Sequence, residues 1–153
     1  MKAITILEPW ASLIAYGEKK IETRSWETKY RGRIVIHAGK SKKYIRGVIA
    51  KFNGIQLPDK FTLNYGKVIA IADLVDCTQF VHSLIPGRNT ILLNGEEVTE
   101  KEIAFGDCTV GRWAWVLENV QRVEPLPAKG QQRIWNLDVP ALEIAAWHSG
   151  MEE

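Results

Sequence analysis

Three charged side chains stand close together near the start of the chain: Lys19, Glu22 and Arg24. Glu22 and Arg24 are two positions apart, so on a β-strand they project from one face, close enough to form an ion pair. Lys19 follows the expected turn at Gly17, where strict strand alternation does not apply. A carboxylate between two cations offsets their repulsion and orients both toward a shared anion. The spacing therefore predicts a polar cluster on a cleft that binds a phosphate or another anion, with an ordinary solvated turn as the alternative.

The residues on either side of this cluster predict the elements that position it. Residues 3–7 are short and β-branched, which is typical of a strand. Pro9 suits the first turn of a following helix, and Gly17 is placed to end that helix in a left-handed cap. The hydrophobic period changes to two from Ile21, which indicates a strand. The cleft should therefore be lined partly by the helix, in which Trp10 is more commonly a core residue than a platform for a ligand.

The rest of the chain predicts several strands with short helices between them. Strands are expected at 33–38, 68–75 and 112–120, helices at 41–52, 99–106 and 141–147, and a hairpin around residues 94–95. Asp73 and Asp76 should interrupt the second of these strands, and 125–133 should be a loop. No regular βαβ alternation is present, which argues against a doubly wound parallel sheet. The pattern favours one α+β domain over residues 1–153, a small mixed β-barrel with flanking short helices.

Composition excludes several classes of protein. Apolar residues make up 46% of the chain and charged residues 25%, which is ordinary for a globular protein. No apolar stretch is long enough to cross a membrane and the start has no signal-peptide pattern, so we expect a cytoplasmic protein without membrane association. Cys77 and Cys108 are isolated, which favours free thiols over a disulfide. The histidines are not spaced as metal ligands and no nucleotide-cofactor motif is present, so no metal or cofactor is expected.

Charge is distributed unevenly along the chain. Residues 1–51 hold 12 Lys and Arg against 4 Asp and Glu, a net charge of +8, whereas residues 52–153 carry a net charge of −6. Unless the fold interleaves these charges evenly, one face should be positive and should attract nucleic acid or another polyanion. The side chains expected to reach phosphates are Lys19, Arg24, Arg31, Arg33, Lys42 and Lys43. Trp26 continues the face of Glu22 and Arg24, so it should border the cleft, where it can stack on an unpaired base.

Several segments of the chain resemble one known family, the ASCH domain, which is named for its homology to the activating signal cointegrator. They are Ile6–Leu13, then Gly17-x-Lys19-x-x-Glu22-x-Arg24-Ser25-Trp26 and Tyr30-Arg31-Gly32, with supporting matches at 66–77, around Trp115 and at 127–137. The family signature G-x-K-x-x-E-x-R is matched fully, and the resemblance spans roughly residues 3–138. It implies a PUA-like fold with a cleft beside the signature that is associated with binding RNA or other nucleic acid.

The resemblance also implies an alternative activity. One branch of small relatives hydrolyses the amide of N4-acetylcytidine, with a lysine matching Lys19 but a threonine in place of Glu22. Thr23 is one position away, which on a strand means the opposite face. That triad is completed by a further glutamate, and Glu100 and Glu102 lie in roughly the right part of the chain.

Two main hypotheses follow from these residues. The first is a binding module for RNA, single-stranded nucleic acid or a nucleotide, in which Glu22 accepts from a base amino group or holds its cationic neighbours. The second is a hydrolase acting on N4-acetylcytidine or RNA through Lys19 and Glu22. A lysine paired with a carboxylate stays charged, which favours phosphate binding over general-base catalysis. A protein-interaction or regulatory domain is the remaining alternative, and the oligomeric state is not indicated.

Overall fold

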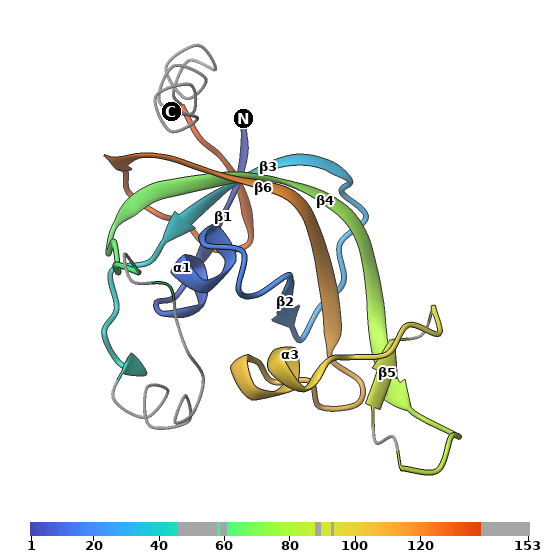
Figure 1. Cartoon of the computed structure of the whole chain (residues 1–153). Coiled ribbons are helices and arrows are strands. Elements are labelled where there is room, and N and C mark those ends of the chain that lie inside the picture. Colours follow the sequence, from blue (N-terminus) through green and yellow to red (C-terminus); the bar gives the residue numbers. More distant parts are fainter. Residues whose placement is uncertain (46–57, 59–60, 88–89, 93, 139–153) are drawn as a thin grey trace.

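One curved sheet organises the chain (Figure 1). The computed structural model describes residues 1–45, 58, 61–87, 90–92 and 94–138. The strands are β1 (Lys2–Ile6), β2 (Ile21–Arg24), β3 (Gly32–Ala38), β4 (Lys67–His82), β5 (Thr90–Leu92), β6 (Trp113–Pro127) and β7 (Ile134–Asn136). They are ordered β2-β6-β4-β3-β1-β7, with β5 added to the far end of β4. The pair β1–β3 is parallel and the others are antiparallel, so the sheet is mixed.

Two long strands give the sheet its curvature. β4 and β6 arch over helix α1 (Trp10–Ala15) and continue down to β5 and helix α3 (Glu100–Phe105), as Figure 1 shows. Their pairing shifts register three times, including between Ile71 and Asp73 and between Leu74 and Asp76. Such irregularities bend a strand and increase its twist. The result is a half-barrel with two short helices among the described residues, which confirms the α+β prediction.

The expected interruption of β4 at its two aspartates is wrong. Asp73 accepts a hydrogen bond from the Asn119 side chain at 2.9 Å, and Asp76 accepts one from the backbone of Cys77 at 2.8 Å. Their carboxylates are therefore satisfied while the backbone continues as a strand. The two residues mark register shifts in the strand rather than its end.

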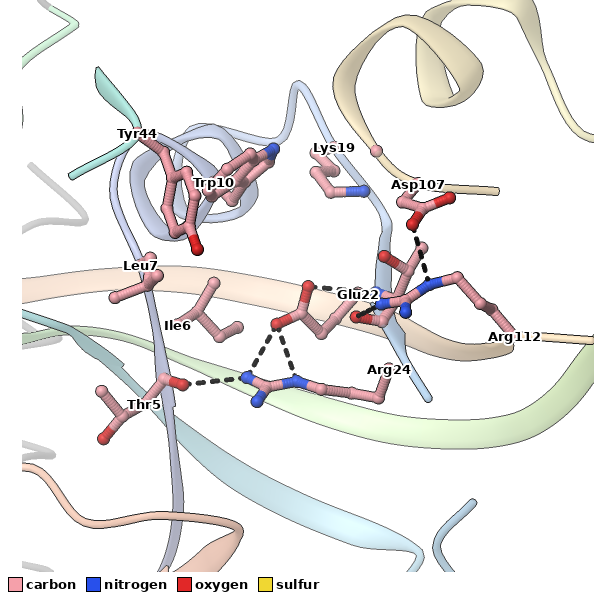
Figure 2. A pocket seen from close by; sticks show the side chains of 12 residues that line it. Thr5, Ile6, Leu7, Trp10, Lys19, Glu22, Arg24, Tyr44, Asp107 and Arg112 are labelled. Carbon is pink, nitrogen blue, oxygen red and sulfur yellow. Dashed lines mark hydrogen bonds and ion pairs between the residues drawn. The ribbon is translucent and has the colours of Figure 1, made fainter. Parts of the chain in front are cut away.

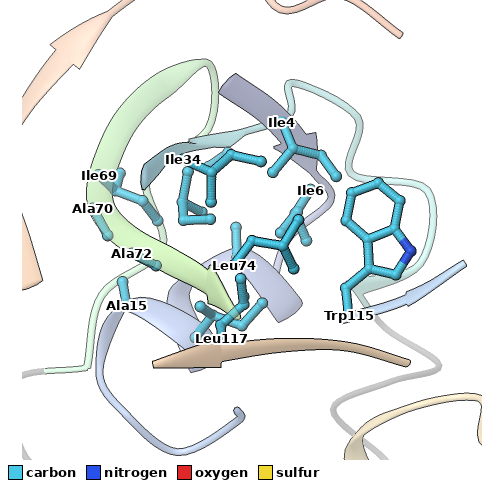
Figure 3. Packing of buried hydrophobic residues seen from close by; sticks show 14 residues of the cluster. Ile4, Ile6, Ala15, Ile34, Ile69, Ala70, Ala72, Leu74, Trp115 and Leu117 are labelled. Carbon is cyan, nitrogen blue, oxygen red and sulfur yellow. The ribbon is translucent and has the colours of Figure 1, made fainter. Parts of the chain in front are cut away.

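The inner face of the sheet packs on α1 (Figure 3). Alternate residues of β1, β3 and β4 point inward, among them Ile4, Ile34 and Leu74, and each is at most 2% exposed. On β6, Trp115 belongs to this cluster whereas its neighbour Ala114 belongs to a second cluster, because successive side chains of a strand point to opposite faces. These contacts fix the position of α1 against the sheet.

The outer face is covered by the end of the described chain. Ala3, Val35 and Val68 pack there against Trp135, which lies on β7. The sequence did not predict β7, because a strand of three residues is too short to show a period. The helix expected at 141–147 lies outside the described residues, as does most of the one expected at 41–52.

Both helices that carry the candidate site end or begin as expected. Gly17 has φ +77° and its N–H donates to Ile14, while the N–H of Glu18 donates to Leu13, so α1 closes in a Schellman cap. At α3 the Thr99 hydroxyl accepts from the N–H of Glu102, which is one half of a capping box. The hairpin expected at 94–95 is confirmed in part, because Gly95 has φ +90° and β5 runs into that turn.

Candidate functional site

A pocket of about 430 Å³ opens between α1, β2 and the segment that follows α3 (Figure 2). Its lining residues are Thr5, Ile6, Leu7, Trp10, Lys19, Glu22, Thr23, Arg24, Tyr44, Gly106, Asp107 and Arg112. The end of β1 forms its floor, and the polar residues come mainly from β2 and its flanks. The three residues of the predicted cluster, Lys19, Glu22 and Arg24, therefore lie in one pocket.

Lys19 occupies the linker between the cap of α1 and β2. Its N–H donates to the carbonyl of Leu13 at 3.1 Å, so the helix cap itself sets where this residue stands. The side chain is 1% exposed and its Nζ donates to Glu102 Oε2 at 3.3 Å. Glu102 also accepts from the backbone N–H of Lys20 at 2.5 Å, so its carboxylate serves this turn instead of the capping box. The expected partner of Lys19 was Glu22; the structure instead pairs it with Glu102.

Gly106 leaves the space that the Lys19 ammonium occupies. A Cβ added at Gly106 would lie 2.9 Å from Lys19 Nζ. The backbone of Gly106 has φ −132° and ψ 170°, which any residue adopts, so glycine is required here only by the close approach.

We expect Gly106→Ala to move the ammonium while leaving the fold nearly unchanged. The group in the way is the far end of a flexible side chain, so the free energy of unfolding should fall by no more than about 1 kcal/mol. The ¹⁵N resonance of the Lys19 ammonium in a protein spectrum should shift. Gly95→Ala is a contrasting variant at a positive-φ turn, where the loss should be in stability alone. An unmoved Lys19 resonance in Gly106→Ala would contradict this interpretation.

Glu22 and Arg24 form the predicted pair on one face of β2. Glu22 Oε2 accepts from Arg24 Nε at 3.2 Å and from Nη2 at 2.9 Å, and Glu22 Oε1 accepts from the N–H of Thr23 at 3.0 Å. Arg24 Nη2 also donates to the carbonyl of Thr5 at 2.8 Å. Glu22 is 8% exposed, so this pair, in which two guanidinium nitrogens donate to one carboxylate oxygen, is largely shielded from solvent. The arrangement ties β2 to the end of β1 across the pocket.

An aromatic wall faces these charges. Trp10 and Tyr44 lie on one side of the pocket in Figure 2, with Glu22 and Arg24 on the other. The two ring centroids are 6.0 Å apart, and the Trp10 indole donates to the carbonyl of Phe105 at 2.5 Å. Trp10 is thus half-buried against the core, its more common role, and also lines the pocket.

The sequence missed Arg112, a third cation of the pocket. Its Nη2 donates to the carbonyl of Thr23 at 3.3 Å, and its Nε lies 3.4 Å from Asp107 Oδ2 in an ion pair without hydrogen-bond geometry. Arg112 precedes β6, which pairs with β2 from Trp113 onward. Only that pairing, which joins segments far apart in the chain, reveals that Arg112 belongs to the site.

Thr23 also lines the pocket, contrary to the expectation that it faces away. β2 is an edge strand, and Gly106 lines the same pocket as Thr23. The Thr23 methyl lies 3.6 Å from the position of a Cβ on Gly106, close to the Lys19 ammonium. Facing the opposite way from Glu22 therefore does not remove Thr23 from the site.

The structure does not bring the remaining predicted residues into the pocket lining. Trp26 packs edge-on against Trp115 at 4.7 Å, with the Arg133 guanidinium over its ring. The others are the exposed cations Arg31, Arg33, Lys42 and Lys43. Arg31 lies 3.8 Å from Asp76, whereas Lys43 lies over the ring of Tyr44 and so stands near the pocket rim. Strand alternation misplaced Trp26 because β2 ends at Arg24.

Both cysteines are free thiols, as predicted. Burial raises the pKa of Cys108 to about 11, and the nearby Lys19 ammonium offsets this only in part. Cys108 is therefore not a ready nucleophile beside the pocket. Within the described ranges, no group of three His, Cys, Asp or Glu side chains could hold a metal ion. No helix in the same ranges is long and apolar enough to cross a membrane.

Comparison with known proteins gives consistent matches. The model of the ASCH domain family matches residues 4–127. Two curated relatives, both named Activating signal cointegrator 1, are 26% identical over 144 residues (Homo sapiens) and 29% identical over 142 residues (Mus musculus). Each match covers 88% of this chain but 22% of the relative, so the chain corresponds to about a fifth of those proteins.

Solved structures share the fold. The crystal structure of ASCH from Zymomonas mobilis superposes with a TM-score of 0.54 at 16% identity, covering 95% of this chain and 92% of that one. A mutant of the same protein gives 0.50 at 18% identity, covering 89% and 88%. At this identity the likeness concerns the fold, which is the PUA-like α+β architecture expected from the sequence.

Proposed function

The chain belongs to the ASCH domain family, and we propose that it binds single-stranded nucleic acid, RNA in particular, through the pocket beside Lys19. The observation that carries this proposal is the buried ammonium of Lys19 at the pocket wall. An ammonium has three donors, and among the described residues Glu102 is the acceptor found for it. Donors remain for a phosphate or a base carbonyl, and a buried donor without a partner favours binding one.

The charges of the pocket fit a nucleotide. Lys19, Arg24 and Arg112 line it together with Glu22 and Asp107, so cations outnumber carboxylates by one. Cations attract phosphate, whereas a carboxylate such as Glu22 accepts from base amino groups. Both kinds of group are needed to hold a nucleotide rather than a simple anion.

The shape of the pocket fits one unpaired base. Its volume of about 430 Å³ lies within the ~300–1,000 Å³ typical of small-ligand sites. Trp10 and Tyr44 offer aromatic surface, and stacking on such rings is worth about 1–3 kcal/mol per base. A base in a duplex is not available to this pocket, so single strands should be preferred.

We expect Arg24→Gln to weaken binding of a fluorescein-labelled single-stranded RNA by at least tenfold, because one charged hydrogen bond is worth about 1.5–3 kcal/mol. Fluorescence anisotropy would measure the affinity. Arg33→Gln is the matched control, since Arg33 is an exposed arginine outside the pocket. It removes the same charge and should change the affinity by twofold or less.

Two results would contradict the proposal. One is absence of binding by the wild-type protein to single strands of RNA and DNA. The other is an equal effect of the two arginine variants, which would assign binding to overall charge.

Charge reversal at Lys42 and Lys43 tests whether the bound strand extends beyond the pocket. Each lost phosphate contact should flatten the slope of log affinity against log salt concentration by about 0.7–0.9.

A second function, hydrolysis of N4-acetylcytidine, is favoured by one observation. Lys19 lines the pocket and is paired with the Glu102 carboxylate, and Thr23 lines the same pocket. In that reaction water cleaves the amide and yields cytidine and acetate. Incubating the wild-type protein with N4-acetylcytidine and separating the nucleosides by chromatography would test it. Turnover that disappears in Glu102→Gln supports hydrolysis, and absence of turnover leaves binding alone.

A further inference from the structure

A buried histidine lies behind the floor of the pocket. His37 is on β3, is 1% exposed, and pairs in the parallel β1–β3 ladder with Thr5. Its Nδ1 lies 3.1 Å from Thr5 Oγ1, and its Nε2 lies 2.7 Å from the carbonyl of Ala128. The Trp135 indole nitrogen is 3.1 Å from the same Thr5 hydroxyl. None of these partners is a member of the signature.

The hydrogen bonds assign the proton of His37. An indole N–H can only donate, so the Thr5 oxygen accepts from Trp135. The carbonyl of Ala128 can also only accept, so His37 Nε2 carries a proton. In the neutral ring Nδ1 is then unprotonated and accepts the hydroxyl proton of Thr5. In this arrangement the Thr5 hydroxyl both accepts from Trp135 and donates to the ring.

The surroundings of His37 disfavour a second proton. Burial lowers the pKa of His37 below its usual range, and the field of Lys40 acts in the same direction. The backbone bonds with Ala128 and Gly66 oppose this shift. Lys40 is the one charged side chain that acts on the ring within the described ranges, and Thr5 and Trp135 supply the other side-chain contacts.

Thr5 connects this network to the pocket. Its carbonyl accepts from Arg24 Nη2 at 2.8 Å, and the same guanidinium holds Glu22. Thr5 lies just beyond the last β1–β7 pair, Ile4 with Ile134, so Arg24 takes the place of a strand partner there. The position of the Thr5 carbonyl thus bears directly on the charged wall.

The segment after β6 closes tightly over the same pair. A Cβ added at Gly130 would lie 2.7 Å from both His37 Cε1 and Thr5 Oγ1. The segment continues to Arg133, whose guanidinium lies over Trp26. The His37 ring therefore has no free space to move into, and any movement of the ring must displace Thr5 or the segment after β6.

We propose that His37 is a positioning residue for the pocket. Its neutral ring fixes Thr5 and, through Thr5, Arg24. Protonation of His37 therefore loosens the pocket and weakens the binding of its ligand. This inference rests on the proposed function only for the identity of the ligand that the pocket binds. A proton at Nδ1 turns the acceptor facing the Thr5 hydroxyl into a donor. The Thr5 hydroxyl then loses its bond to the ring as a donor and must turn its proton elsewhere, which disturbs the end of β1 that also carries the Thr5 carbonyl.

The first test needs no ligand. In an NMR titration from pH 8 to pH 5, the Arg24 Nε–H resonance should move together with the Cε1–H resonance of His37. His37→Gln keeps a donor toward Ala128 but does not titrate, so its Arg24 resonance should stay in place. His82→Gln is the matched control at an exposed histidine and should behave as the wild type. An Arg24 resonance that ignores the titration of His37 would overturn the inference.

The second test measures affinity over the same range. The probe is a uridine oligonucleotide, whose bases do not titrate between pH 5 and pH 8. Wild-type affinity should fall over the pH range in which the His37 resonance titrates, whereas His37→Gln should keep a flat profile; parallel profiles over that range would overturn the inference. If the wild type binds no oligonucleotide at pH 8, the proposed function fails, and the NMR titration alone decides the role of His37.

Discussion

Replacing Lys19 by methionine should lower the free energy of unfolding by about 3–5 kcal/mol, because it leaves one member of a buried ion pair without its partner. The Glu102 side chain is 9% exposed and its carboxylate bonds both Lys19 Nζ and the N–H of Lys20. Methionine fills nearly the same volume, so little of the loss would come from packing. Urea unfolding followed by circular dichroism gives the measurement.

A second substitution separates charge from shape. Adding Glu102→Gln to the methionine variant removes the stranded charge, while the amide oxygen can still accept from Lys20. Much of the lost stability should therefore return, although Glu102→Gln alone should destabilise the protein. Lys20→Met is the control. Because Lys20 is exposed, this substitution should lower the free energy of unfolding by less than about 0.5 kcal/mol. Additive losses from the two buried substitutions would show that Lys19 and Glu102 do not interact.

The local part of the site was predictable because it depends on short spacings. A glycine that ends a helix and two charged residues at i and i+2 on a strand are visible in the sequence. Gly17, Glu22 and Arg24 are accordingly found as expected. The Lys19–Glu102 pair spans 83 positions, and no local period indicates it. The sequence placed Glu102 only in the right region and favoured Glu22 as the partner.

The strands show the same division between local and long-range information. β3 begins and ends within one residue of its expected bounds, whereas β4 and β6 each run seven residues further. Asp76 made the extension of β4 look like a strand end, and the extension of β6 begins with the polar residues Gln121 and Arg122. They are tolerated because the extension of each strand pairs with the first part of the other strand and lies partly open to solvent. Pairing between distant segments therefore overrides the local composition there.

Glu8→Ala should also destabilise the protein strongly, on the order of 3–5 kcal/mol, because each buried donor left unpaired costs about 1–3 kcal/mol. Glu8 is 1% exposed. Its Oε1 accepts from the N–H of Ser12 at 2.8 Å, and its Oε2 accepts from the Ser12 hydroxyl at 2.5 Å and the N–H of Asn64 at 2.7 Å. One carboxylate thus joins the first turn of α1 to a segment 56 positions away.

Glu8 appears in the sequence only as one residue of the run before the signature, and nothing local marks it as buried. Its effect reaches the pocket because α1 carries Trp10 at its start and leads to Lys19 after its cap. Ser12→Ala removes only the hydroxyl contact and should cost about 1 kcal/mol, which makes it the matched control. Thermal unfolding followed by circular dichroism would compare the two variants. If Glu8→Ala loses no more stability than Ser12→Ala, the bonds to the backbone of Ser12 and Asn64 do not hold the helix, and the placement of Trp10 must depend on packing alone.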